Sequence, residues 1–304
     1  MQRGQWQRIK ADMRERHYST IPFGLDTDAI LHAREAFLQF LTLPRNVKDP
    51  LCYSLKNDGG GLVGYKFSTP TKGETDAKEH FHYHASLEDL ASLEACPDLG
   101  VVVGKYVQDD GVHKKGDDLY QRLTPFEAQR RVVDALRHGG VQARTFLDAA
   151  AVVHKAATRT ITDLAAEIEH DLPGFSAAMF PGGDPYFFLR FIAYHPAATL
   201  GKPHYDRGCI TLAIDESGPG LRIGRDKDSI ALVKERLPGE ALIFVSLGLK
   251  ERMAALGLEP AWHDIVRVDG APYVAPDIAR TSMVFFADLK EKFDRPYAET
   301  HPDK

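Results

Sequence analysis

Apolar positions in the first half of the chain recur at helical spacing. Residues 27–42 place apolar side chains three or four positions apart and are followed by Pro44, which predicts a helix that ends there. The segment Thr124-Pro125-Phe126-Glu127 is a capping box with proline at the first helical position. A second helix is therefore expected to begin at this segment and to end at Gly139-Gly140.

The longest helical pattern follows in residues 142–171, before Pro173. Its apolar stripe recurs at steps of three or four and predicts an amphipathic helix with one face in the core. The stripe consists of Phe146, Ala150, Val153, Ala157, Ile161, Leu164 and Ile168. Residues 51–85 are instead glycine-rich and alternating, which predicts short strands and loops.

The pattern changes near residue 180 to short β-type runs separated by glycine, proline and acidic turns. These runs cover 186–194, 209–214, 220–224, 241–246, 263–268 and 281–289. Several short strands within about 100 residues favour a sandwich or jelly roll over a parallel α/β sheet. No Pro/Gly/Ser linker marks the change, so we expect one α+β domain over 1–304. It would combine a mostly helical region (1–178), a β core (179–290) and a polar tail (291–304).

Composition narrows the possible partners and the compartment. The 304 residues are 43% hydrophobic and 27% charged, with a formal net charge of −5, as is usual for a globular protein and without a basic footprint for nucleic acid. No apolar run resembles a signal peptide or a membrane span, so no membrane partner is expected. The odd cysteine count (Cys52, Cys96 and Cys209) fits a reduced cytoplasmic location. These data leave the oligomeric state open.

The sharpest chemical signal is His204-Tyr205-Asp206. Residues i and i+2 of a strand face the same side, so the imidazole and the carboxylate can reach one metal ion. His263 begins a later β-type run and is the candidate third ligand. Two histidines and one carboxylate form a facial triad that suits Fe(II) and leaves coordination positions open. A histidine two residues before an aspartate is also common by chance, and a surface or structural histidine is the alternative.

Two other patterns compete for a functional interpretation. His80, His82 and His84 alternate and could present three imidazoles on one strand face, as in a cupin, but the expected glycine spacing is absent. A position near the mouth of a pocket is favoured, with His82 as a possible pocket residue. Gly59-Gly60-Gly61-Leu62-Val63-Gly64 fits a nucleotide loop by letter, but neither a preceding strand nor a following helix supports that interpretation.

Arg280 and Ser282 strengthen the iron-site interpretation. They begin the last β-type run and share one strand face, where they offer a bidentate fork and a hydroxyl for a carboxylate.

In this order the motifs resemble the iron(II)- and 2-oxoglutarate-dependent oxygenases of the isopenicillin N synthase-like group. The resemblance extends from about residue 60 to residue 290. The matching segments are Gly64-Tyr65, Asp76 to Phe81, LRFIAYHP (189–196), HYDRGCITL (204–212), GLRI (220–223), GEALIFVS (239–246), His263 and Arg280-x-Ser282. The resemblance implies a double-stranded β-helix (jelly-roll) core with a helical N-terminal layer.

The same resemblance implies roles for individual residues. His204, Asp206 and His263 would ligate iron. Arg280 and Ser282 would bind the distal carboxylate of the cosubstrate 2-oxoglutarate, and Tyr194 would add a hydroxyl contact. Ile192 stands where the family often has asparagine, which removes one cosubstrate hydrogen bond. Dioxygen would be consumed, with succinate and carbon dioxide as products.

Strand alternation extends the analysis to the substrate. If Arg280 and Tyr194 face inward, so do Phe286, Asp288 and Arg190. Charged groups on an inward face are costly unless they are paired or bound to a ligand. We therefore expect these three residues to contact a small polar substrate, with an amino-acid derivative as one candidate. A structural salt bridge, between Arg190 and Asp288 or with other partners, is the alternative.

Three functions follow, from two classes. The leading hypothesis is an Fe(II)- and 2-oxoglutarate-dependent dioxygenase that hydroxylates, desaturates or cyclises a small molecule. An Fe(II)-dependent oxidase of the same fold that does not use 2-oxoglutarate is an alternative within metal chemistry. A non-catalytic binding module on this fold is the third, although the complete ligand triad argues against it.

Overall fold

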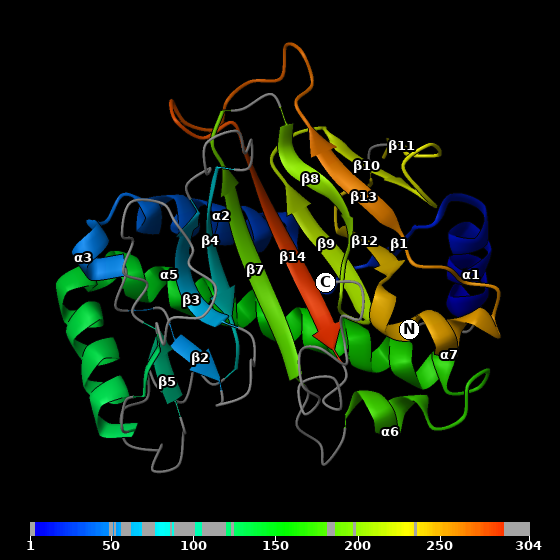
Figure 1. Cartoon of the computed structure of the whole chain (residues 1–304), viewed down its shortest axis with the longest axis horizontal. Helices are drawn as coiled ribbons and strands as arrows, with labels where there is room; N and C mark the ends of the chain where they lie inside the picture. Colours follow the sequence, from blue (N-terminus) through cyan, green and yellow to red (C-terminus); the bar gives the residue numbers. More distant parts are fainter. Residues whose placement is uncertain are drawn as a thin grey trace.

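A computed structural model gives the architecture of the chain (Figure 1). It describes residues 4–48, 51, 53–55, 62–68, 77–85, 87, 101–104, 120–122, 125–180, 186–196, 199–233 and 236–288. Several sequence features fall outside these ranges: Thr124 of the capping box, most of the 59–64 glycine run, Cys52, Cys96 and the 291–304 tail.

The helices are concentrated before residue 180. They are α1 (Gln5–Arg16), α2 (Thr27–Leu41), α3 (Arg45–Lys48), α5 (Pro125–Ile168), α6 (Phe175–Met179) and α7 (Lys250–Ala254), with a 3₁₀ turn at Leu247–Leu249. Asp26 caps α2 by accepting a hydrogen bond from the Ala29 backbone. The predicted helix over 27–42 is confirmed by α2.

The two helices predicted after residue 124 are also present, as one long element. α5 begins at Pro125 and contains a break at Gly140, whose φ of 57° and ψ of −142° are not helical. All seven apolar residues predicted for the stripe after Gly140 are fully buried. In the described part of the chain, no helix is long and apolar enough to cross a membrane.

The strands form two antiparallel sheets. The larger has the order β1-β12-β9-β14-β7-β4-β3-β2-β5-β6, and the smaller has the order β11-β10-β13-β8. Early strands are β1 (Ser19–Pro22), β2 (Tyr53–Leu55), β3 (Leu62–Ser68), β4 (Lys78–Tyr83), β5 (Val101–Gly104) and β6 (Tyr120–Arg122). Later strands are β7 (Tyr186–Tyr194), β8 (Thr199–Tyr205), β9 (Ile210–Glu216), β10 (Leu221–Gly224), β11 (Ala231–Leu232), β12 (Glu240–Val245), β13 (Trp262–Val266) and β14 (Arg280–Asp288).

This arrangement confirms the predicted α+β class and the double-stranded β-helix core. Each of the six β-type runs overlaps an observed strand, with boundaries that differ by at most two residues. Strand β8, which carries His204, lay outside those six runs. The N-terminal region also adds strands to the large sheet, because β1 pairs with β12 and β4 pairs with β7.

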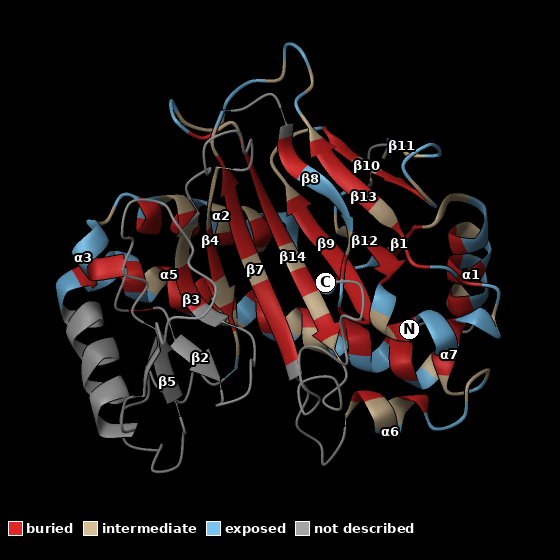
Figure 2. Ribbon diagram, in the orientation of Figure 1, coloured by how far each residue is buried: buried red, intermediate tan, exposed pale blue. Residues whose placement is uncertain are grey.

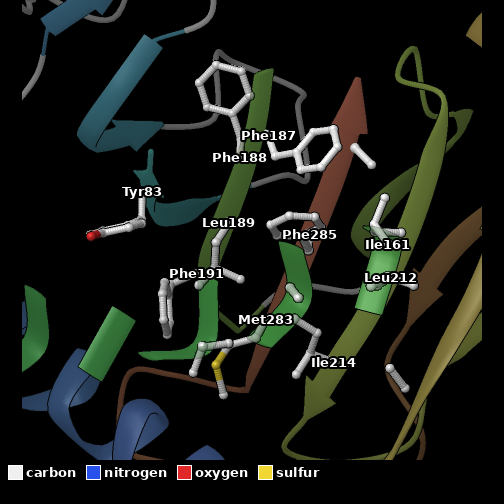
Figure 3. Packing of buried hydrophobic residues seen from close by; sticks show 14 of the residues in the cluster. Tyr83, Ile161, Phe187, Phe188, Leu189, Phe191, Leu212, Ile214, Met283 and Phe285 are labelled. Carbon is white, nitrogen blue, oxygen red and sulfur yellow. The ribbon is translucent and has the colours of Figure 1, made fainter. Parts of the chain in front are cut away.

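Alternation along the central strands separates two apolar clusters. Phe191, Met283 and Phe285 face the cluster that packs beneath α2 and α5 (Figure 3). Ile192 and Val284, on the opposite face, join a second cluster between the two sheets. The buried centre of the large sheet, coloured red in Figure 2, is therefore covered by helices on one side and by the small sheet on the other. The second cluster lines the interior of the jelly roll.

Candidate functional site

His204, Asp206 and His263 converge at the small sheet. His204 near the end of β8 and His263 on β13 are direct partners in the antiparallel pairing, and their rings lie 4.3 Å apart. Asp206 follows β8 immediately and lies between them. Its Oδ1 is 3.4 Å from His204 Nε2 and its Oδ2 is 3.6 Å from His263 Nε2. One ligand atom from each residue lies within 4.8 Å of the other two.

Backbone carbonyls fix the orientation of both imidazoles. His204 Nδ1 is 2.7 Å from the carbonyl oxygen of Lys202, and His263 Nδ1 is 3.2 Å from that of Ala261. A carbonyl only accepts, so each Nδ1 carries a proton and donates it. With Nδ1 engaged in this way, each ring presents Nε2 toward Asp206, and in the neutral form of the ring the Nε2 lone pair can bind a metal. The donor set therefore fits a divalent transition metal.

Asp206 is buried yet ionised. Burial by itself would raise the pKa of Asp206, but the two neighbouring imidazoles and a hydroxyl hydrogen bond outweigh it and lower the pKa well below its usual range. The hydroxyl belongs to Thr211, which donates to Oδ2 at 2.8 Å and lies 2.9 Å from Ser246 Oγ. The pKa of His263 is lowered, chiefly by burial, whereas that of His204 is raised by Asp206 against the effect of burial. His204 is the exposed member of the set.

Arg280 and Ser282 also lie together, at the N-terminal end of β14. Arg280 Nη1 donates to Ser282 Oγ at 2.7 Å, and its Nε donates to the carbonyl oxygen of Gly218 at 3.2 Å. Both side chains are buried. Tyr194 stands directly opposite Arg280 on β7, on the same face of the sheet. The three residues predicted to bind the cosubstrate therefore form one group.

Glu216 is a member of this group that sequence analysis missed. Its Oε1 lies 2.7 Å from Arg280 Nη2, so the buried guanidinium already has a carboxylate partner. Strict alternation from Thr211 would instead direct Asp215 inward. A register shift in the β9–β14 pairing changes this, because Ala213 pairs with Val284 but Glu216 pairs with Ser282.

Asp215 consequently points to the helical side of the sheet. It forms an ion pair with Arg34 on α2, with an Oδ2–Nη1 distance of 3.2 Å. The bulge therefore places Glu216 on the inner face of the sheet, beside Arg280, and Asp215 on the helical face, beside Arg34. Local pattern alone carries no signal for such a shift.

Arg190 and Phe286 contact each other on adjacent strands. The Arg190 guanidinium carbon lies 4.6 Å from the centroid of the Phe286 ring. Arg190 Nε donates to His82 Nε2 at 2.5 Å. Among the described residues, no carboxylate forms an ion pair with Arg190, so the alternative of an Arg190–Asp288 ion pair is not realised. His82 pairs directly with Arg190 across β4 and β7 and lies on the same face of the sheet.

Glycines in the motif segments allow close approaches between strands. A Cβ at Gly208 would come 2.4 Å from Oδ1 of Asp288, so a larger residue there would displace the Asp288 carboxylate. A Cβ at Gly220 would lie 2.2 Å from the carbonyl oxygen of Val266, and φ at this residue is 130°. The backbone contact and the positive φ thus require glycine at position 220, beside Arg280.

The N-terminal motif forms a second polar cluster, centred on Glu79. Its Oε2 accepts hydrogen bonds from Tyr65 Oη at 2.5 Å and from Lys48 Nζ at 3.1 Å. Oε1 lies 3.4 Å from His195 Nε2, while Nδ1 of that ring is 2.8 Å from the carbonyl oxygen of Asp277. Burial opposes ionisation, but these partners lower the pKa of Glu79 to about 2. This cluster joins α3, β3 and β4 to the end of β7.

Comparison with known proteins identifies the fold. No protein-family model and no curated protein match the chain. Solved structures do match, among them dioxygenase for auxin oxidation 1 from Arabidopsis thaliana in a binary complex with 2-oxoglutarate. It is 16% identical, with a TM-score of 0.60 over 97% of this chain and 92% of that one.

Two further solved structures have the same fold. JOX2 in complex with 2OG, Fe and JA is 16% identical, with a TM-score of 0.60 over 97% of this chain and 74% of that one. A full-length Neurospora crassa protein in complex with alpha-KG is 14% identical, with a TM-score of 0.54 over 94% of this chain and 80% of that one. The chain therefore has the fold of the 2-oxoglutarate/Fe(II) oxygenases.

Proposed function

We propose that the chain is a non-haem Fe(II)- and 2-oxoglutarate-dependent dioxygenase of the isopenicillin N synthase-like group. It would hydroxylate, desaturate or cyclise a small polar molecule and release succinate and carbon dioxide. The observation that carries this proposal is the convergence of His204, Asp206 and His263, with both Nδ1 protons committed to backbone carbonyls. The buried thiol of Cys209 fits the reducing cytoplasm that we propose as its location.

In this proposal His204, Asp206 and His263 would hold the iron. Fe(II) and 2-oxoglutarate, when bound, supply the oxidation of an unactivated C–H bond by dioxygen. Thr211 keeps the Asp206 carboxylate in position through its hydrogen bond to Oδ2. The apolar residues between the sheets limit the access of water to the reacting atoms.

Arg280, Ser282 and Tyr194 would bind the distal carboxylate of 2-oxoglutarate. The Arg280–Glu216 ion pair occupies part of the guanidinium, so the cosubstrate carboxylate would have to replace Glu216 at Nη2. Ser282 Oγ is already 2.7 Å from Nη1 and can turn to share the incoming carboxylate. Arg190, Phe286 and Asp288 would contact the substrate, for which an amino-acid derivative remains a candidate.

Anaerobic titration of the Fe(II)-loaded protein with 2-oxoglutarate tests the proposal. A visible metal-to-ligand charge-transfer band is expected in the wild type. His204→Ala should abolish it, because a ligand is lost, and the exposed position of this side chain separates that loss from a folding defect. Arg280→Ala should need at least about tenfold more 2-oxoglutarate for the same band.

The other outcomes identify the alternatives. Bound iron without a charge-transfer band would favour the Fe(II)-dependent oxidase that does not use 2-oxoglutarate. A wild-type protein that binds no iron would favour the non-catalytic binding module. Measurement of iron content beside the spectrum separates these two results.

A further inference from the structure

Arg190 is a cation that the proposed iron and cosubstrate sites do not use. It lies on β7 between Phe188 and Ile192 in the inward-facing row, two strands away from β9 and directly between β4 and β14. The side chain is half-buried, and burial lowers the pKa of its guanidinium. A cation in such a place requires a compensating partner.

Neither of the described side chains in contact with Arg190 is a carboxylate. Phe286 covers one face of the guanidinium, and His82 accepts from Nε. Since Nε–H can only donate, His82 Nε2 must be unprotonated and the ring neutral. The neighbouring His80 ring is 4.7 Å from that of His82, and burial lowers its pKa well below the usual value. The contacts therefore orient Arg190 without neutralising it.

Arg190 lies on the same inner surface of the large sheet as Thr211, which contacts the candidate metal ligand Asp206. Asp206 has the largest electrostatic influence of any carboxylate on Arg190, ahead of Asp288. Phe286 pairs with Thr211 across β9 and β14, and Thr211 is hydrogen-bonded to Asp206. Phe286 thus lies between the guanidinium and the metal ligands along the inner surface of the sheet. With Nε engaged, the Nη edge is the part that remains for a ligand.

We propose that Arg190, held by His82 and Phe286, binds the carboxylate of the substrate, which is therefore a small organic acid. This inference rests on the proposed function for the identity of the bound molecule as substrate. The planar guanidinium binds a carboxylate through two parallel hydrogen bonds. Phe286, whose ring packs against the guanidinium, offers an aromatic surface to the body of the acid.

The test compares phenylacetate, its uncharged analogue phenylacetamide, and phenyl phosphate. Binding to the Fe(II)-loaded protein without oxygen is measured by calorimetry, for the wild type, Arg190→Met and Arg280→Met. We expect phenylacetate to bind the wild type at least about tenfold more tightly than the amide or the phosphate ester. Arg190→Met should abolish this preference, and Arg280→Met should retain it.

Three results would overturn the inference. The wild type could lack the acid-over-amide preference, or prefer phenyl phosphate, or lose the preference in Arg280→Met while keeping it in Arg190→Met. Should Arg190→Met not fold, the wild type decides: acid binding that persists at saturating 2-oxoglutarate supports Arg190, and displacement places the acid at Arg280. Loss of 2-oxoglutarate binding alone would count against the proposed function and leave the acid site standing.

Discussion

Asp206 and Glu79 are two shielded carboxylates beside histidines, yet their surroundings differ in one respect. Their side chains are 9% and 13% exposed. Glu79 has a lysine ammonium in contact, together with a tyrosine hydroxyl. Within the described residues, the ion pairs of Asp206 are with imidazoles alone, and both of these direct Nε2 toward it. At Glu79 the chain itself supplies a positive charge, the ammonium group of Lys48. At Asp206 it supplies two imidazoles, which together with the carboxylate could bind a metal cation.

This difference separates a structural cluster from a metal centre more clearly than burial or pKa does. Both carboxylates have lowered pKa values despite the opposing effect of burial. A lowered pKa reports only that the charged form is favoured. The identity and protonation of the partners decide whether a metal can enter, because an ammonium group has no lone pair to offer a metal and already neutralises the carboxylate. Variants in the two clusters should therefore affect different properties.

The largest expected effect is the loss of metal binding in Asp206→Ala. Removing the only carboxylate of the triad should weaken Fe(II) binding by more than about 100-fold, because two imidazoles alone make a poor iron site. The affinity is measured anaerobically by calorimetry, and thermal unfolding of the metal-free protein provides the control. If the variant retained wild-type iron affinity, the assignment of the centre would be wrong.

Glu79→Gln should instead reduce the stability of the fold and leave iron binding nearly unchanged. A pKa of about 2, against an ordinary value of 4.5, corresponds to at most about 3.5 kcal/mol at about 1.4 kcal/mol per pKa unit. We expect the variant to lose about 2 to 3 kcal/mol of unfolding free energy while its iron affinity stays within about twofold. Denaturant unfolding of the metal-free protein measures the first quantity. A stable variant with impaired iron binding would reverse the comparison.

The pH dependence of this stability difference sharpens the test. The pKa of Glu79 is lower in the folded state, so its contribution is present above pH 4.5 and is lost as the pH falls toward 2. The pKa of His195 is raised by Glu79, so its share is present at low pH and is lost as the pH rises through that raised value. The difference between wild type and Glu79→Gln should therefore be largest between about pH 4.5 and pH 6.5.

A smaller effect is expected when the orientation of Asp206 is disturbed. Thr211→Val keeps the shape of the side chain and removes the hydroxyl that donates to Oδ2. Loss of such a contact to a metal ligand typically weakens metal binding by about 10- to 100-fold. Titration with Fe(II) measures this, and Thr281→Val, a buried threonine beside Arg280 on β14, is the matched control. Equal effects of the two variants would argue for a general packing defect.

The smallest effect concerns the carboxylate that occupies Arg280. Glu216→Gln removes the competing negative charge, so 2-oxoglutarate should bind more tightly, by roughly three- to tenfold. The charge-transfer titration measures the change, with Asp215→Asn on the opposite face of β9 as the control. Weaker cosubstrate binding in Glu216→Gln would show that this ion pair orients Arg280 for the cosubstrate.

The sequence by itself determined the individual helices and strands, and it determined which candidate site residues share one face of a strand. The stripe after Gly140, the β-type runs and the spacing of His204 and Asp206 all depend on periods of 3.6 or 2, which the backbone imposes locally. The inward face of β14 followed from the same alternation and was correct for Arg280, Ser282 and Phe286. The order of family motifs then indicated the fold.

The tertiary structure alone decided which side chains meet across strands. One bulge between Met283 and Val284 brings Glu216 to Arg280 and sends Asp215 to Arg34. Likewise, only the β4–β7 register places His82 beside Arg190. Such pairings depend on non-local strand register, and a shift of one residue reverses the face on which a side chain lies. No local period in the amino-acid sequence contains that information.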